Sequence, residues 1–126
     1  MKIIFCRHHS ICEPGILKSL PRLGHDVIEF MNDREPQDYD KDYIIRLATL
    51  IQQTTDVCAI LSVCFSPIIA RASKPFGIPY ISYTVDSPCS TLYSKTMEYP
   101  HNRLFLFDKL QLDKFRHRNP GNCFHT

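Results

Sequence analysis

Residues 79–88 read Pro-Tyr-Ile-Ser-Tyr-Thr-Val-Asp-Ser-Pro, a β-branched and aromatic run that ends in an acid, a hydroxyl and a proline. Such a run predicts a buried strand that delivers Asp86 to a loop. A second run, Leu-Phe-Leu-Phe-Asp over 104–108, ends in Asp108 in the same way. Parallel α/β sheets bind their ligands outside the carboxyl ends of the strands, so these two acids mark where a site is to be sought.

Strand patterns alternate with helix patterns along the rest of the chain. Strands are predicted over residues 2–6, 26–31, 57–63, 80–85 and 104–107, with the start of one more over 122–125. Helices are predicted from about residue 14 to 24, over 41–54, from 66 to 77, briefly within 87–99 and over 108–115. The alternation predicts a Rossmann-like α/β domain of three layers, in which helices cover both faces of a mostly parallel sheet of five to six strands.

The strand count also predicts the order of the sheet. A single strand, 26–31, intervenes between the first strand and the strand over 57–63, so the third strand is expected to pair with the first. The resulting order is 2-1-3-4-5, with a crevice between the loops at His8 and Cys64, where chain direction reverses. Asp86 then lies on the next strand over, near the crevice but not at its centre.

Local signals set the expected helix boundaries. Apolar residues at i, i+3, i+4 and i+7 make 41–54 an amphipathic helix: Ile44, Leu47, Ala48 and Ile51. Pro21 predicts a kink or an early end of the first helix, and Gly24 and Gly77 are natural helix stops. The polar segment 32–42, which contains Pro36, is expected to be an exposed connection.

Length and charge narrow the class of protein. All 126 residues fit one domain (1–126), and 15 basic and 13 acidic residues are mixed along it for a net charge of +2, so no nucleic-acid partner is implied. No apolar run approaches the roughly 20 residues of a membrane span. Residues 1–6 predict a strand and not a signal peptide. We therefore expect a cytoplasmic protein whose six cysteines are free thiols.

Neither a cofactor nor a metal is expected. Four glycines, Gly15, Gly24, Gly77 and Gly121, cannot form a G-x-G-x-x-G fingerprint or a P-loop. Zinc is suggested by the residue types that follow the first strand: Cys6, His8, His9 and Cys12. On a strand, however, Cys6 and His8 share one face while His9 points to the other, and no C-x-x-C pair exists. A metal-binding protein built on these four residues therefore stays an alternative hypothesis that the spacing does not favour.

Each candidate site residue has a structural alternative. His8 or His9 can act as a general base or hydrogen-bond a polar ligand, and an ordinary loop histidine fits equally well. Ser66 precedes Pro67 at a helix start, where N–H groups can hold a hydroxyl, or Ser66 is only a helix cap. Asp86 can bind sugar hydroxyls, or it can form an Asx-type turn or cap a short helix with Pro88 in its first turn, and the two roles can coexist.

Asp108 is assigned mainly to helix capping. Gln111 follows it by three residues, the spacing of a capping box, in which the amide reaches back to the first residue.

Four motifs together resemble the N-terminal region of the CgeB-like (spore maturation protein-type) glycosyltransferases. They are Ser-Ile-Cys-Glu-Pro over 10–14, Leu-Gly-His-Asp-Val over 23–27, Tyr-Thr-Val-Asp-Ser-Pro over 83–88 and Asn-Arg-Leu-Phe-Leu-Phe-Asp over 102–108. The similarity covers nearly the whole chain, in order. The Thr-Val-Asp-Ser-Pro and Arg-Leu-Phe-Leu-Phe-Asp motifs are its most specific part.

The resemblance implies a GT-B enzyme, in which two Rossmann-like domains face each other across a cleft. This chain resembles the acceptor-side half, which would meet a nucleotide sugar and an acceptor only with a C-terminal domain and is expected to be inactive by itself. Acceptor binding is assigned to residues at the crevice, namely His8, His9, Ser10, Phe65, Ser66, Asp86 and Ser87. The catalytic candidates are His8, His9 and Asp86.

A second hypothesis stays open beside the enzyme. The chain can be a stand-alone binding or interaction module of flavodoxin-like shape without enzymatic activity, which pairs with a partner domain or with itself as a homo-oligomer.

Overall fold

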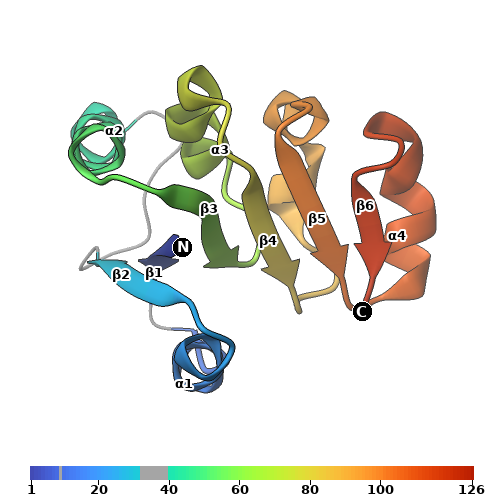
Figure 1. Cartoon of the computed structure of the whole chain (residues 1–126). Coiled ribbons are helices and arrows are strands. Elements are labelled where there is room, and N and C mark those ends of the chain that lie inside the picture. Colours follow the sequence, from blue (N-terminus) through green and yellow to red (C-terminus); the bar gives the residue numbers. More distant parts are fainter. Residues whose placement is uncertain (9, 32–39) are drawn as a thin grey trace.

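One parallel sheet organises the molecule. The computed structural model describes residues 1–8, 10–31 and 40–126. Within them six strands form the order β2-β1-β3-β4-β5-β6, and every neighbouring pair is parallel (Figure 1). The strands are β1 (Lys2–Arg7), β2 (Asp26–Met31), β3 (Val57–Val63), β4 (Tyr80–Thr84), β5 (Asn102–Leu106) and β6 (Cys123–His125). The predicted order 2-1-3-4-5 is confirmed, and β6 extends it at the outer edge.

Helices connect the strands at the predicted places. The α-helices are α1 (Glu13–Arg22), α2 (Lys41–Gln53), α3 (Pro67–Ser73) and α4 (Lys109–Phe115). Short 3-10 helices are η1 (Lys74–Phe76), η2 (Ser90–Tyr93), η3 (Lys95–Glu98) and η4 (Arg116–Arg118). As predicted, α1 ends early, one residue past Pro21, and Gly24 follows in the left-handed region at φ +88°.

The structure confirms the capping role of Asp108, but it corrects the cap assigned to Ser66 and the capping box that includes Gln111. Ser66 occupies the N-cap position of α3, but its side chain makes no capping hydrogen bond. Asp108 does cap α4, because its Oδ1 accepts from the Leu110 N–H at 3.0 Å, but Gln111 does not complete a capping box. The Gln111 amide is buried against the segment after β4 and is bonded there instead, as described below.

The predicted connection over 32–42 falls mainly outside the described residues. Its described end caps α2, where the Asp40 carboxylate accepts from the Tyr43 N–H at 3.1 Å.

The two faces of the sheet carry separate cores. On one face, α2, α3 and α4 pack on Ile60, Tyr80, Leu104 and their neighbours. On the other, Leu17 and Leu20 of α1 pack on Phe5 and Val63. Figure 1 shows α1 below the sheet and α2 and α3 above it. The strands therefore separate into two groups, β1 and β3 buried on both faces, and β4 and β5 with alternating burial.

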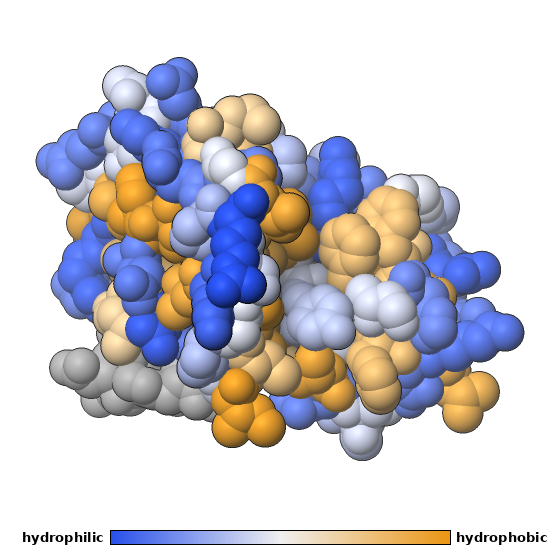
Figure 2. Space-filling model, turned by 60° about the horizontal axis from the view of Figure 1, so that its bottom comes forward, coloured by the Kyte–Doolittle hydropathy of each residue, from blue (hydrophilic) through white to orange (hydrophobic). Residues whose placement is uncertain are grey.

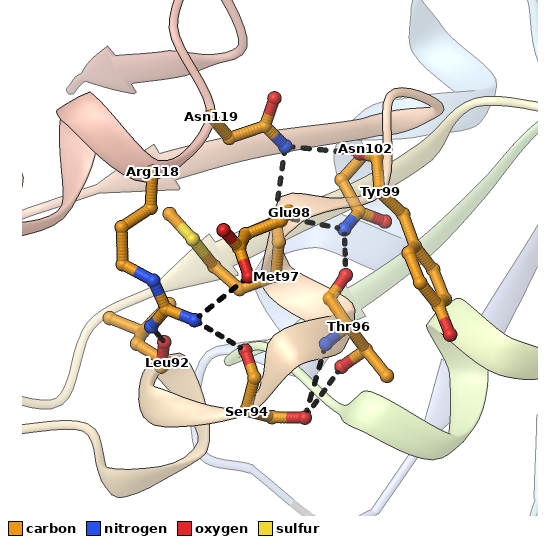
Figure 3. A network of polar contacts seen from close by, with 9 residues as sticks. All are labelled: Leu92, Ser94, Thr96, Met97, Glu98, Tyr99, Asn102, Arg118 and Asn119. Carbon is orange, nitrogen blue, oxygen red and sulfur yellow. Dashed lines mark hydrogen bonds and ion pairs between the residues drawn. The ribbon is translucent and has the colours of Figure 1, made fainter.

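Side-chain to backbone hydrogen bonds fix the segment between β4 and β5 (Figure 3). Asn119 Nδ2 donates to the carbonyls of Met97 (2.8 Å) and Tyr99 (3.0 Å), and Arg118 Nη1 donates to that of Leu92 at 2.9 Å. From β5, Asn102 Nδ2 donates to the Thr96 carbonyl at 2.7 Å. A connection that contains only 3-10 turns thus gains a defined shape from the start of β5 and from the segment after α4.

No helix in the described part of the chain is long and apolar enough to cross a bilayer. All six cysteines are free, as predicted.

We predict that Asn119→Ala destabilises the fold by about 1–3 kcal/mol, because two carbonyls lose a donor at a site where Asn119 is only 5% exposed. Urea unfolding followed by circular dichroism measures the change. His117→Ala, at an exposed position two residues away, is the matched control and is expected to stay within about 0.5 kcal/mol of wild type. Equal stability of the two variants would contradict the role of the network.

Candidate functional site

A cavity of about 200 Å³ opens at the carboxyl ends of β1, β3 and β4, at the crevice predicted between His8 and Cys64. Three loops form its walls, one after each of these strands, and α2 contributes Tyr43. The lining residues are His8, Tyr43, Val63, Cys64, Phe65, Ser66, Pro67, Ile69, Asp86, Pro88, Cys89, Ser90 and Thr91.

The buried Glu13 carboxylate holds the first loop, which carries His8. Its Oε2 accepts from the His8 N–H at 2.9 Å, and its Oε1 accepts from Arg7 Nε at 3.2 Å. Arg7 Nη1 also donates to Glu29 Oε1 at 2.6 Å, which ties β2 to the same cluster. Burial acts to raise the pKa of Glu13, but the N–H donors of His8 and Ser10 together with Arg7 outweigh it and hold the pKa below the ordinary value. The loop is therefore anchored by a charged carboxylate.

The hydroxyl of Tyr80 holds the second loop. It accepts from the Ser66 N–H at 2.9 Å and lies 2.6 Å from Ser62 Oγ. Ser62 Oγ in turn donates to the Cys64 carbonyl at 2.9 Å, so the Tyr80 proton is directed to Ser62 Oγ. The Tyr80 ring stacks on Phe65, with ring centroids 5.8 Å apart. Tyr80 thus holds Ser66 by a direct hydrogen bond and Phe65 by stacking, and it acts on Cys64 through Ser62.

Cys64 has an unusual backbone conformation. Its φ of +64° lies in the left-handed region, which a non-glycine residue seldom adopts outside constrained sites. Two hydrogen bonds hold it there, one from its N–H to the Tyr83 carbonyl (2.8 Å) and one from Ser62 Oγ to its own carbonyl. This conformation places the Cys64 thiol 3.3 Å from Asp86 Oδ2, to which it donates. Burial raises the pKa of Cys64 to about 11, so the group is a neutral donor near pH 7 and not a thiolate nucleophile.

Gln111 holds the third loop. Its Oε1 accepts from the Cys89 N–H at 2.8 Å, and its Nε2 donates to the Asp86 carbonyl at 3.1 Å. These bonds clamp both ends of the segment from Asp86 to Cys89, within which the Ser87–Pro88 peptide bond is cis. The Asp86 carboxylate stays exposed at the mouth of the cavity.

The arrangement suits a polar, uncharged ligand with an apolar face. The imidazole of His8, the carboxylate of Asp86 and the hydroxyls of three residues (Ser66, Ser90 and Thr91) supply donors and acceptors. Tyr43, Phe65 and Pro67 supply apolar wall. Such a mixture of a few convergent polar groups with apolar surface is typical of small-molecule sites.

The structure brings most of the predicted site residues together. His8, Phe65, Ser66 and Asp86 line the cavity. Ser10 does not line it, because its Oγ accepts from the Cys12 N–H and its carbonyl accepts from the Glu13 N–H at the start of α1. His9 lies outside the described residues.

Ser87 lines a neighbouring cavity, where its hydroxyl donates to the Asp108 carboxylate. This bond, with the Leu110 N–H, lowers the pKa of Asp108.

Cys6, His8 and Cys12, three of the residues that suggest zinc, form no metal-binding group in the structure. Among residues 1–8, 10–31 and 40–126, no group of three or more histidine, cysteine and acidic side chains is arranged to hold a metal ion. Cys6 faces the core beside Tyr43, where burial raises its pKa to about 12. A buried neutral thiol is a poor metal ligand.

Sequence reasoning missed the three anchors of the loops, Glu13, Tyr80 and Gln111. In the sequence, Glu13 and Gln111 occupy positions that are typical of the first turn of a helix. Tyr80 occupies a position that is typical of a strand. Their side chains are committed to partners in the loops only once the layers pack.

Comparison with known proteins finds no matching family model, no matching curated protein and no matching solved structure. The resemblance to CgeB-like glycosyltransferases therefore stands on the motif residues alone.

We predict that Glu13→Gln destabilises the fold by about 1–3 kcal/mol at pH 7, because Arg7 loses a buried charged partner. The folded-state pKa of Glu13 lies below the ordinary value of 4.5, so its contribution is complete above about pH 4.5 and is lost as the pH falls through the folded-state pKa. The stability difference between wild type and variant should shrink over that acid range. Urea unfolding from pH 7 to pH 3 measures it, with exposed Asp113→Asn as control. A difference independent of pH would contradict the assignment.

We predict that Tyr80→Phe costs about 1–3 kcal/mol and speeds hydrogen exchange at the Ser66 amide, which loses its acceptor. Tyr93→Phe removes an exposed hydroxyl and should leave both quantities near wild type. Thermal unfolding and amide exchange by NMR provide the two readouts. Unchanged protection of Ser66 in Tyr80→Phe would refute the proposed anchoring.

Proposed function

We propose that the cavity binds a sugar-like acceptor, and that the chain is the acceptor-side domain of a glycosyltransferase resembling the CgeB-like enzymes. The observation that carries the proposal is the placement of His8 and Asp86 on the same cavity, at the carboxyl ends of β1 and β4, the two strands that flank β3 in the parallel sheet. Polyhydroxylated ligands need such acceptors and donors beside apolar wall.

Asp86 would accept a hydrogen bond from an acceptor hydroxyl. Its Oδ2 already accepts a hydrogen bond from the Cys64 thiol, which orients the carboxylate and leaves the other oxygen for a ligand. His8 lies opposite, across the crevice from the third loop, with its ring partly exposed and Nδ1 3.7 Å from Glu13 Oε2. An imidazole in this position can accept a proton from the attacking hydroxyl. The hydroxyls of Ser66, Ser90 and Thr91 complete the set.

Transfer would require a second domain. The described residues carry no glycine-rich phosphate loop that could hold the phosphates of a nucleotide donor. We expect the chain to bind an acceptor alone but to transfer sugar from a nucleotide donor only when a donor-binding domain faces it.

A binding module without catalysis is the second candidate. The sheet order 2-1-3-4-5, which flavodoxin-like domains share, favours it. The two candidates differ in whether a donor domain adds turnover, and acceptor binding alone does not separate them.

Amide NMR with monosaccharides, among them glucose, galactose and N-acetylglucosamine, tests the acceptor site. We predict shifts at His8, at residues 64–66 and at residues 86–91. Asp86→Asn should raise the dissociation constant about tenfold, a loss of about 1.4 kcal/mol of binding free energy, because a charge-assisted hydrogen bond is lost. Asp113→Asn, on exposed α4 surface, is the matched control. Shifts confined to other parts of the sheet, or equal affinities for both variants, would rule the site out.

A further inference from the structure

The sheet face that carries α1 is open over β4, β5 and β6. Side chains alternate on β4 and β5, so Tyr80, Ser82 and Thr84 are buried under the helices while Ile81 and Tyr83 are only half-buried. In register, Ile81 lies beside Arg103, Tyr83 beside Phe105, and Phe105 beside Phe124. In Figure 2, where this side comes forward, orange and pale side chains gather over the right half of the molecule. We call these five side chains the open face: Ile81, Tyr83, Arg103, Phe105 and Phe124.

Parallel sheets occur almost only with both faces covered, because the crossover connections between their strands place helices on both faces. On the same side, α1 covers the β1 and β3 half, where Phe5 and Val63 are completely buried. The open face instead leaves Phe124 39% exposed, in a stack with Phe105 at 5.0 Å between ring centroids. Among the described residues, α1 therefore covers β1 and β3 on this face but leaves β4, β5 and β6 without a helix.

The dimensions of the open face fit one helix. Three adjacent strands spaced about 4.8 Å apart span about 10 Å, which is the diameter of an α-helix with its side chains. A strand of five residues runs about 17 Å, the length of about eleven helical residues. A helix of three turns that lies along the strands beside α1 would cover the aromatic side chains of the open face, Tyr83, Phe105 and Phe124.

The positive charge of Arg103 indicates which kind of helix would bind to the open face. Arg103 lies at the start of β5, and its Nη1 donates to the carbonyls of Pro100 and Asn102, both at 2.8 Å. Among the described residues no carboxylate lies within ion-pair distance of its guanidinium. A second copy, docked by the same face, would bring a second Arg103 and no acid. A helix with a carboxylate at its end supplies the missing partner.

We propose that the open face is the docking surface for an amphipathic α-helix of a partner protein, which lays its apolar stripe on Tyr83, Phe105 and Phe124 and pairs a carboxylate with Arg103. Recognition of this kind, a helix on an apolar groove, is read as anchors at i, i+3, i+4 and i+7. The proposal does not depend on the acceptor site.

Two synthetic helical peptides test the proposal on the full 126-residue chain. Both carry the same leucine stripe over about fourteen residues, and they differ only in a terminal-turn glutamate or lysine. We expect the glutamate peptide to shift the amides of β4, β5 and β6 and to bind about tenfold tighter than the lysine peptide. Arg103→Glu should reverse that preference, whereas Arg22→Glu, at an exposed position on α1, should not.

Several results would overturn the proposal. They are equal affinity for both peptides, shifts at His8 and Asp86 in place of the open face, or tighter binding of a single-stranded oligonucleotide to the same residues. Self-association that Phe124→Ser abolishes would assign the face to a second copy. Should Arg103→Glu fail to fold, Phe124→Lys, at a partly exposed position, takes its place and must abolish peptide binding.

Discussion

The hydroxyl of Tyr80 is the interaction on which the site depends. Its ring rises from the start of β4 into the core, and its oxygen joins the Ser66 N–H to Ser62 and, through Ser62, to the Cys64 carbonyl. Complete burial raises the pKa of Tyr80 well above its ordinary value, so the phenol stays neutral and keeps its donor. A neutral hydroxyl that both accepts and donates can hold a left-handed residue in place at the end of a strand.

The other two loops around the cavity are held in the same way, by a buried polar side chain that hydrogen-bonds the loop backbone. Each loop is anchored by one buried polar side chain from outside the cavity lining, Glu13 for the first and Gln111 for the third. Because these anchors satisfy the loop backbone, the groups that face the cavity, above all His8 and Asp86, are left for a ligand. Preorganisation of this kind reduces the ordering cost that a ligand would otherwise meet.

Sequence patterns predicted the fold well because strands and their order depend on local signals. The apolar runs at 26–31 and 57–63 match β2 and β3 at both ends. Long-range partners were not predictable. Gln111 has capping-box spacing yet bonds Cys89, 22 residues away, and Cys64 occupies a backbone region where glycine would be expected. The open face was also missed, since its alternating residues read as ordinary buried strand in a parallel sheet.

A crystal structure of the chain soaked with a mixture of monosaccharides tests the central claim most directly. The account predicts ligand density between the His8 imidazole and the Asp86 carboxylate, with the Cys64 thiol still bonded to Asp86. Density on another edge of the sheet, with this cavity holding only solvent, would contradict it.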